Sequence, residues 1–414
     1  MKKHQILYVI AIVFFTAGCS SNSQSNDNLP SIDVRKNYPE KEIMLTDIAD
    51  VTYVHLNTTD EDYLYKGSLL HVTENTLVMS DESSVSILFF SKDGNPKSRF
   101  NRFGSGPEEY TQKRLMQIIY DESTDDVFLL SLAYNPRSIP VYSSTGEFKR
   151  RLILPKEVMP FPIVDFDDQS LLMYDLQKQL SGVKSEYQSQ SCREIDIIPQ
   201  AVNTSYYHIS KTDGAVLEYV EILSNEADFM RPVDGGRGGI PIFNRIAKGA
   251  DGLFVCDIET DTVFLYNKNK TLIPIICKTP LINDLDPKII LVDFMEAGKY
   301  QFMFVYTMIS REERMKIPRD ELYKHYNRHY LRDKQTGEIF HQKIRCPDYT
   351  EKDFFITARN MFFTGKETLA YFELDLFELK KASQENKLNG KLKELVASLD
   401  EMNDNNVLMF ATFK

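Results

Sequence analysis

Short apolar segments alternate with polar turns along most of the chain, a pattern that indicates strands. In one stretch, four such segments cover residues 116–120, 127–132, 138–142 and 148–153, with polar connections between them. Runs of four to eight residues rich in β-branched and aromatic side chains, bounded by turn residues, are typical of strands. We therefore predict four antiparallel strands in this unit.

One hairpin recurs through the chain and marks a repeat. Its first strand is apolar or aromatic, and its polar turn is usually closed by glycine. Asp-Gly, Thr-Gly and Asn-Lys turns supply the positive φ that tight hairpins require. Two further strands precede each hairpin, which predicts four-stranded blades repeated around an axis. The five turns end at Gly94, Gly146, Gly214, Lys270 and Gly337.

The two ends of the chain together supply a sixth blade. After the fifth hairpin we expect only three strands, over residues 354–358, 368–373 and 407–413, while residues 51–56 form a spare strand near the start. If the spare strand pairs with the last one, the ring closes. We predict an all-β fold, a six-bladed β-propeller of four-stranded antiparallel blades whose N-terminal strand completes the last blade. An open two-sheet sandwich with a helical tail is the alternative.

The long connections are expected on one face of the propeller. With the strands of each blade lettered a to d from the axis outward, the b-to-c and d-to-a connections hold every long insertion. Both classes leave an antiparallel blade on the same side, and we call this side the loop-rich face. Two insertions, 311–328 and 388–402, have apolar residues at helical spacing, so small helices are expected there. Variable loops on a rigid scaffold often carry function.

The N-terminus has the features of an export signal. Lys2 and Lys3 precede an apolar run over residues 6–15, which is too short to span a membrane but suits a signal peptide. The run leads to Thr16-Ala17-Gly18-Cys19, which resembles the lipobox of bacterial lipoproteins, although that family usually has Leu where Thr16 stands. The resemblance implies cleavage before Cys19 and acylation of this residue. An ordinary cleaved signal is the alternative.

These features divide the chain into a signal peptide over residues 1–18, a lipidated Cys19 with a polar tether over 19–39, and one propeller domain over 40–414. The expected location is the cell envelope, with a lipid anchor in the outer membrane. Periplasmic and surface-facing orientations both stay open. The other four cysteines lack metal-binding spacing and are expected as buried thiols, with disulfides left open; they are Cys192, Cys256, Cys277 and Cys346.

The charge balance narrows the class of partner. The chain carries 49 basic and 60 acidic residues, a net charge of −11. A general nucleic-acid binder needs a basic face that neutralises phosphates, so this class is disfavoured. We expect a monomer that binds the membrane through its lipid, with no cofactor and no metal.

Residues 102–110, RFGSGPEEY, followed by an apolar strand, resemble an NHL-type propeller repeat, although Glu108 stands where that pattern has glycine. The chain from residue 40 onward is similar to the six-bladed β-propeller lipoproteins of Gram-negative gut-type bacteria. Those chains often end in a run like that of residues 404–409, DNNVLM. The resemblance implies a fold and an envelope location, and it implies no catalytic set.

Two segments contain candidate binding residues. In RFGSGPEEY, the side chains of Arg102, Glu108, Glu109 and Tyr110 can hydrogen-bond to or stack on a polar ligand such as a sugar. The alternative is a blade-to-blade turn in which Gly and Pro serve geometry alone. Arg237 lies in a glycine run over residues 235–239 that can hold an anion through backbone N–H groups, or that simply forms the tip of an insertion.

A helix over residues 311–328 would place Glu321, His325 and the following His329 along one side. Two histidines four residues apart on a helix can bind a metal. The HExxH arrangement is absent, so a solvated helix face is the favoured interpretation.

These patterns predict a non-enzymatic envelope lipoprotein that binds a glycan, a peptide or a partner envelope protein on its loop-rich face. The alternative is a propeller enzyme at the axial opening, either a metal-dependent lactonase or a glycan hydrolase or lyase. A glycosidase would show two carboxyl groups about 5 to 9 Å apart. A binder is expected to have a channel plugged by ordinary side chains. A structural subunit of an envelope complex is a third possibility.

Overall fold

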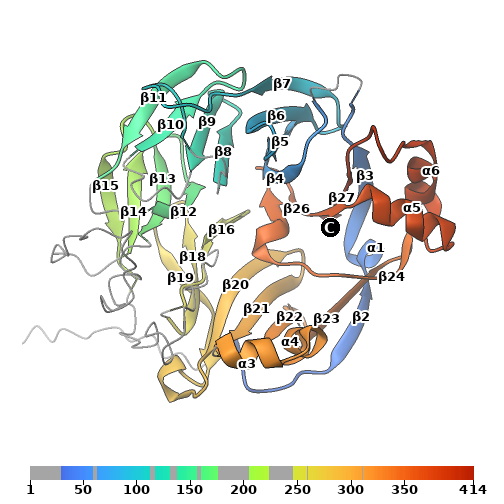
Figure 1. Ribbon diagram of the computed structural model, residues 1–414. Coiled ribbons are helices and arrows are strands. Elements are labelled where there is room, and N and C mark those ends of the chain that lie inside the picture. The colour runs from blue at the N-terminus through green and yellow to red at the C-terminus, as the bar shows by residue number, and fades with distance from the viewer. Residues whose placement is uncertain are drawn as a thin grey trace, which may run out of the picture.

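Six sheets surround a central axis in the computed structural model of the chain (Figure 1). The structure describes residues 29–58, 63–111, 117–130, 138–155, 160–175, 205–222, 246–258, 260–309 and 311–414. Each sheet is a blade with at least four strands, and antiparallel pairing links the four strands of every blade. The predicted six-bladed β-propeller is confirmed.

The first three blades each consist of four consecutive strands. Their second and third strands are almost fully buried, because neighbouring blades cover both faces, and these strands are therefore nearly continuous apolar runs. Blade 1 contains β4 (Gly67–Val72), β5 (Thr76–Asp81), β6 (Ser86–Ser91) and β7 (Pro96–Phe100). Blade 2 contains β8 (Gln117–Asp121), β9 (Asp126–Leu130), β10 (Ser138–Tyr142) and β11 (Phe148–Ile153). Blade 3 contains β12 (Pro160–Asp165), β13 (Ser170–Asp175), β14 (Tyr206–Ser210) and β15 (Val216–Val220).

Blades 4 to 6 include strands from the N-terminal segment. Blade 4 contains β16 (Ile246–Gly249), β17 (Gly252–Val255), β18 (Thr262–Asn267) and β19 (Leu272–Thr279). Blade 5 contains β20 (Ile289–Ala297), β21 (Tyr300–Thr307), β22 (Asn327–Asp333) and β23 (Ile339–Cys346), with β24 (Tyr349–Phe354) paired to β23. Blade 6 contains β25 (Met361–Phe363), β26 (Thr368–Leu374), β27 (Val407–Phe413) and β3 (Ala49–His55).

The strand β3 closes the ring as predicted. It pairs antiparallel with β27 over seven residue pairs, from Val407 opposite His55 to Phe413 opposite Ala49. The strand β3 from the N-terminal part and the C-terminal strand β27 are therefore held in one sheet, which leaves the ring without a free seam.

The segment before β3 adds two strands that the sequence pattern did not predict. The strand β1 (Ser31–Asp33) pairs in parallel with β19, and β2 (Glu40–Met44) pairs in parallel with β23. A short helix, α1 (Leu45–Ile48), then leads into β3. The side chain of Ile32 is fully buried. The folded domain therefore begins inside residues 19–39, the range expected to be tether.

The inner strand of blade 6 differs from the prediction over residues 354–358. Phe354 ends β24 of blade 5, and the inner strand is β25, which follows the short 3-10 helix η6 (Ala358–Asn360). Side chains from blade 5 hold the intervening backbone: the Ile356 N–H donates to Gln342 Oε1 and the Ala358 N–H to Asp293 Oδ1. The segment is apolar because Ile356 fills the core, and it forms no strand.

The five predicted hairpin turns are confirmed, and each predicted turn end has positive φ, from 59° at Lys270 to 89° at Gly94. Several of these turns contact the outer strand of the preceding blade. A Cβ added at Gly94 would lie 2.1 Å from the carbonyl oxygen of His55, and one at Gly146 would lie 2.5 Å from Cβ of Phe100. Glycine is therefore needed for close approach as well as for φ.

The helical insertions lie in b-to-c connections, as predicted. The helices α3 (Arg311–Lys316) and α4 (Arg319–His325) connect β21 to β22, and α5 (Leu376–Gln384) and α6 (Gly390–Ser398) connect β26 to β27. Leu379, Leu392 and Val396 are fully buried in the largest core cluster. Figure 1 shows α5 and α6 at the rim of blade 6, beside β3. The remaining short helix is η5 (Ile282–Asp284).

Within the described ranges, every helix is too short or too polar to cross a bilayer. Cys256, Cys277 and Cys346 are free thiols, buried or partly buried, as expected. Cys192 lies outside the described residues.

Candidate functional site

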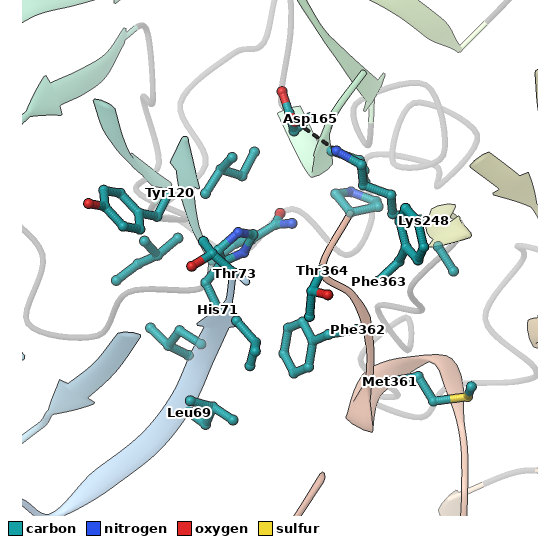
Figure 2. Close-up of a pocket in the computed structure, with 18 of the residues that line it drawn as sticks. Leu69, His71, Thr73, Tyr120, Asp165, Lys248, Met361, Phe362, Phe363 and Thr364 are labelled. Atoms are coloured by element: carbon teal, nitrogen blue, oxygen red, sulfur yellow. Dashed lines mark hydrogen bonds and ion pairs between the residues drawn. The ribbon is translucent and has the colours of Figure 1, made fainter. Parts of the chain in front are cut away.

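A cavity of about 820 Å³ lies on the axis of the propeller. Its wall comes from the innermost strands of five blades, β4, β8, β12, β16 and β25 (Figure 2). The lining reaches the a-to-b turns, where Glu74, Ser123 and Gly365 are exposed. The cavity therefore opens on the face opposite the helical insertions. Its size is within the range of small-molecule sites.

One part of the wall is apolar and aromatic. Figure 2 shows Leu69 and His71 from β4 on one side and Phe362 from β25 on the other. The rings of His71 and Phe362 lie edge to face, with centroids 6.3 Å apart. In Figure 2, Phe363 lies beside Lys248, and the side chain of Met361 is buried. A ligand in the cavity therefore meets the aromatic ring of Phe362 on this side.

His71 is an uncharged polar group in this wall. Burial, together with the positive charge of Lys248, lowers the pKa of His71 to about 4, and the charge of Asp165 and a backbone hydrogen bond at Tyr120 oppose this shift only in part. The imidazole is therefore neutral at pH 7, a state in which it offers one donor and one acceptor.

The opposite part of the wall carries a chain of alternating charges that links three blades. Lys211 Nζ lies 3.0 Å from Asp121 Oδ2 and 2.7 Å from Asp165 Oδ1. Asp165 Oδ2 in turn lies 2.7 Å from Lys248 Nζ (Figure 2). The Lys211 side chain is only 8% exposed, whereas those of Asp165 and Lys248 are 26% and 36% exposed. The last pair is therefore accessible from the cavity.

Lys211 and Asp121 shift each other's pKa values. Burial alone would raise the pKa of Asp121, but hydrogen bonds from Ser123 and Lys211 lower it to about 2. Burial would likewise lower the pKa of Lys211, and Asp165 and Asp121 reverse the shift and raise it. Asp121 and Lys211 therefore both stay charged at neutral pH.

Each carboxylate in the wall has a cationic partner. Glu122 lies 3.6 Å from Lys97 and accepts a hydrogen bond from Thr76 Oγ1, while Glu74 pairs with Lys366. Together with Asp121 and Asp165, these are the four carboxylates among the lining residues. The wall therefore compensates its own negative charge.

A fifth carboxyl group lies behind the wall, on the inner strand of blade 5. Asp293 Oδ1 accepts a hydrogen bond from the Ala358 N–H at 2.7 Å, and Oδ2 has no hydrogen-bond partner among the described residues. Burial raises the pKa of Asp293 to about 6, although the Ala358 N–H and the charge of Arg359 oppose the shift. Ala358 and Arg359 line the cavity, whereas β20 contributes no lining residue.

The candidate residues of RFGSGPEEY lie at the junction of blades 1 and 2, and none of them lines the cavity. Tyr110 is buried and its hydroxyl donates to the Val85 carbonyl at 2.6 Å. Glu109 Oε2 accepts from the Gly106 N–H, and Arg102 Nε donates to the Gly146 carbonyl. Glu108 is exposed. These contacts describe a blade-to-blade turn, and a binding role for the four residues stays a prediction.

Two other predicted sites, Arg237 with its glycine run and the lipidation site Cys19, lie outside the described residues. The expected histidine row does not share one helix. Glu321 and His325 form an exposed pair at 3.1 Å on α4, but His329 lies in β22, where its ring stacks on Phe304. In the described part of the chain, no three His, Cys, Asp or Glu side chains form a metal-binding group.

The residues of the cavity were missed by sequence reasoning. Each of His71, Asp165 and Lys248 is a polar residue within the first apolar run of its blade. A polar position in a strand that faces the axis is the signal that could have identified them. Reading that signal requires the register of each inner strand, which short runs leave open.

The fold and the axial cavity define this protein as a six-bladed β-propeller with a cavity of ligand size on its axis. The chain belongs to the family described as "Domain of unknown function (DUF4934)", which matches residues 29–412. The six-bladed propeller is the part of the predicted resemblance that the structure confirms. The NHL-type pattern and lipoprotein status remain predictions.

Two solved structures are similar to this chain at low sequence identity. A predicted exported protein from Bacteroides fragilis has a TM-score of 0.59 and 15% identity, over 91% of this chain and 99% of that chain. A member of the DUF4221 family from Bacteroides vulgatus has a TM-score of 0.43 and 12% identity, over 89% and 97% of the two chains. No curated protein matches the sequence. At these identities the comparisons show the fold alone.

Proposed function

We propose that this protein is a lipid-anchored envelope protein whose propeller binds a small ligand in its axial cavity without transforming it. The observation that carries the proposal is the cavity of about 820 Å³, with aromatic groups on one side and a few polar groups on the other. Pockets of this size and mixed lining are the usual form of small-molecule sites. The sequence predicted that a binder would have a channel plugged by ordinary side chains and would use its loop-rich face. The axis instead holds the cavity of about 820 Å³, and several loops of the loop-rich face lie outside the described residues.

The charge state of the wall supports binding over glycan hydrolysis. Asp121 and Asp165 both contact Lys211 Nζ, so their carboxylates lie close together. A glycosidase needs one of its two carboxyl groups protonated as a general acid. Asp121 is not suited to this role because its pKa is about 2, and both oxygens of Asp165 contact lysine side chains.

The envelope location rests on the N-terminal sequence and on one comparison. The apolar run over residues 6–15 and the sequence Thr16-Ala17-Gly18-Cys19 support export and lipidation. The Bacteroides fragilis structure of the same fold is described as that of a predicted exported protein. Two or three acyl chains would hold the protein on a bilayer, because each buried CH₂ contributes about 0.8 kcal/mol.

Metabolic labelling with a palmitate analogue tests the anchor. The wild-type chain should carry the label and sediment with membranes. The Cys19→Ala variant should lose both properties. Label that survives in this variant would contradict lipidation at Cys19.

Ligand binding is tested with the purified full-length protein on glycan and peptide arrays. The Phe362→Ala variant removes an aromatic ring from the cavity wall and should weaken binding. The matched control is Phe377→Ala, which removes a 59% exposed ring from α5, away from the cavity. Equal binding by wild type and Phe362→Ala would place the ligand elsewhere and contradict the proposal.

A further inference from the structure

The exposed end of the charge chain is a donor and an acceptor side by side. Asp165 Oδ2 and Lys248 Nζ lie 2.7 Å apart, and both side chains are partly open to the cavity. Asp165 has a second cationic partner besides Lys248, because Lys211 contacts its other oxygen. A hydroxyl group can donate to the carboxylate while a neighbouring hydroxyl accepts from the ammonium. Adjacent hydroxyls of this kind are the defining feature of sugars.

The charged groups of the wall around this pair are balanced by partners. The wall therefore offers little excess charge to bind a cation or an anion. The four lining carboxylates each have a cation within 4.0 Å. Of the two lining cations, Lys248 is paired with Asp165 and the charge of Arg359 acts on Asp293. A charged ligand would lose water without gaining an unpaired counter-charge, which is costly. An uncharged polar ligand avoids this cost.

Across the cavity, the surface suits the carbon face of such a ligand. Phe362 supplies aromatic area, and its ring is held edge to face against His71. His71 adds a neutral hydrogen-bonding group beside the aromatic ring. A sugar ring has hydroxyls at its edge and C–H groups on its faces, so it matches a wall that is polar on one side and aromatic on the other.

We infer that the axial cavity binds a neutral oligosaccharide, with its hydroxyls on Asp165 and Lys248 and a ring face against Phe362. The inference rests on the proposed function, because it assigns the ligand class of that same cavity. A peptide is the competing class of ligand. It becomes an outcome of the test below.

Calorimetric titration of the full-length protein tests the ligand class. The probes are maltotriose, cellotriose and mannotriose as neutral sugars, trigalacturonate as an anionic sugar, and trialanine as a peptide. At least one neutral trisaccharide should bind, and trigalacturonate should bind about tenfold more weakly or not at all. Tighter binding of trigalacturonate or trialanine would overturn the inference while leaving a ligand-binding channel in place. Absence of binding by every neutral sugar would also overturn it.

Two variants test the location. Lys248→Met removes the ammonium while Asp165 keeps Lys211, and it should weaken the neutral sugar about tenfold, the effect of one hydrogen bond to a charged group. Phe362→Ala should weaken the same sugar without changing any charge. The control Lys270→Met breaks an exposed pair with Glu218 on the outer strand of blade 3 and should leave binding unchanged. Sugar affinity insensitive to both cavity variants would overturn the assignment, and channel binding itself would fail with it.

Discussion

Two carboxyl groups on inner strands of the propeller have pKa values that are shifted in opposite directions. They are Asp121 in blade 2 and Asp293 in blade 5. Burial pushes the pKa of both upward. The pKa of Asp121 nevertheless falls to about 2, whereas that of Asp293 rises to about 6. The difference is the partner: Asp121 has the buried ammonium of Lys211 and hydrogen bonds from Ser123, and Asp293 has one backbone N–H. Hydrogen bonds from Ser123 together with the buried ammonium of Lys211 therefore keep Asp121 ionised, whereas one backbone N–H does not offset the burial of Asp293.

The largest expected effect comes from removing that cation. Lys211→Met leaves Asp121 and Asp165 close together with only Lys248 nearby. We expect the free energy of unfolding at pH 7 to fall by about 3 to 5 kcal/mol, as for other broken buried pairs. Urea unfolding at pH 7 measures this loss. A loss under about 1 kcal/mol would show that the charge chain contributes little.

The second-largest effect on stability is expected at Asp293 in blade 5, where the pKa shift has the opposite sign. The folded-state pKa of Asp293, about 6, lies above its ordinary value of 3.8. Its contribution to stability is therefore complete below about pH 4 and is lost as the pH rises through about 6. Asp293→Asn keeps an acceptor for the Ala358 N–H and should stabilise the fold by about 1 to 2 kcal/mol at pH 7, with no gain at pH 4. Urea unfolding at both pH values tests this, and a gain that is equal at both would contradict it.

His71 provides a smaller effect of opposite sign. Its folded-state pKa, about 4, lies below the ordinary value of 6.5. The unfolded chain therefore takes up a proton first as the pH falls, and stability is lost between about pH 6.5 and 4. At pH 5.5 this loss amounts to about 1 kcal/mol, and His71→Gln should abolish it. The measurement is the slope of unfolding free energy against pH, and an unchanged slope would place the titrating group elsewhere.

The smallest effect is expected at an exposed pair of the same chemistry. Lys270, in the turn between β18 and β19 of blade 4, and Glu218, on the outer strand of blade 3, are 41% and 45% exposed. Because water screens such pairs, Lys270→Met should change the unfolding free energy by less than about 1 kcal/mol. A loss comparable to that of Lys211→Met would mean that burial is not what separates the two pairs.

The repeat was predictable because its signal is local. A hairpin turn ending in Gly94 or Gly146 needs a residue that tolerates positive φ, and that need is visible in the sequence. The strand β3 was predictable because a closed ring requires a partner for the three strands that remain after blade 5. The helices α3, α4 and α6 followed from apolar spacing within long insertions, whereas α5 lies outside the ranges predicted to be helical.

Other parts of the fold depend on contacts between distant segments. The strands β1 and β2 are three and five residues long, and only the open edges of β19 and β23 explain why they form. Residues 354–358 are apolar like a strand, but Asp293 and Gln342 bind their backbone N–H groups. The candidate site was missed for the same reason, since Lys211 and Asp121 are 90 positions apart.

The sequence by itself predicted the export signal and determined the number of blades and the positions of the turns. Period, length and turn chemistry are properties of neighbouring residues, so they can be read along the chain. Only the tertiary structure decided which side chains reach the axis and which carboxylates gain a cation. Ring closure brings the inner strands of five blades to one cavity, and burial there makes each charge depend on a partner from another blade.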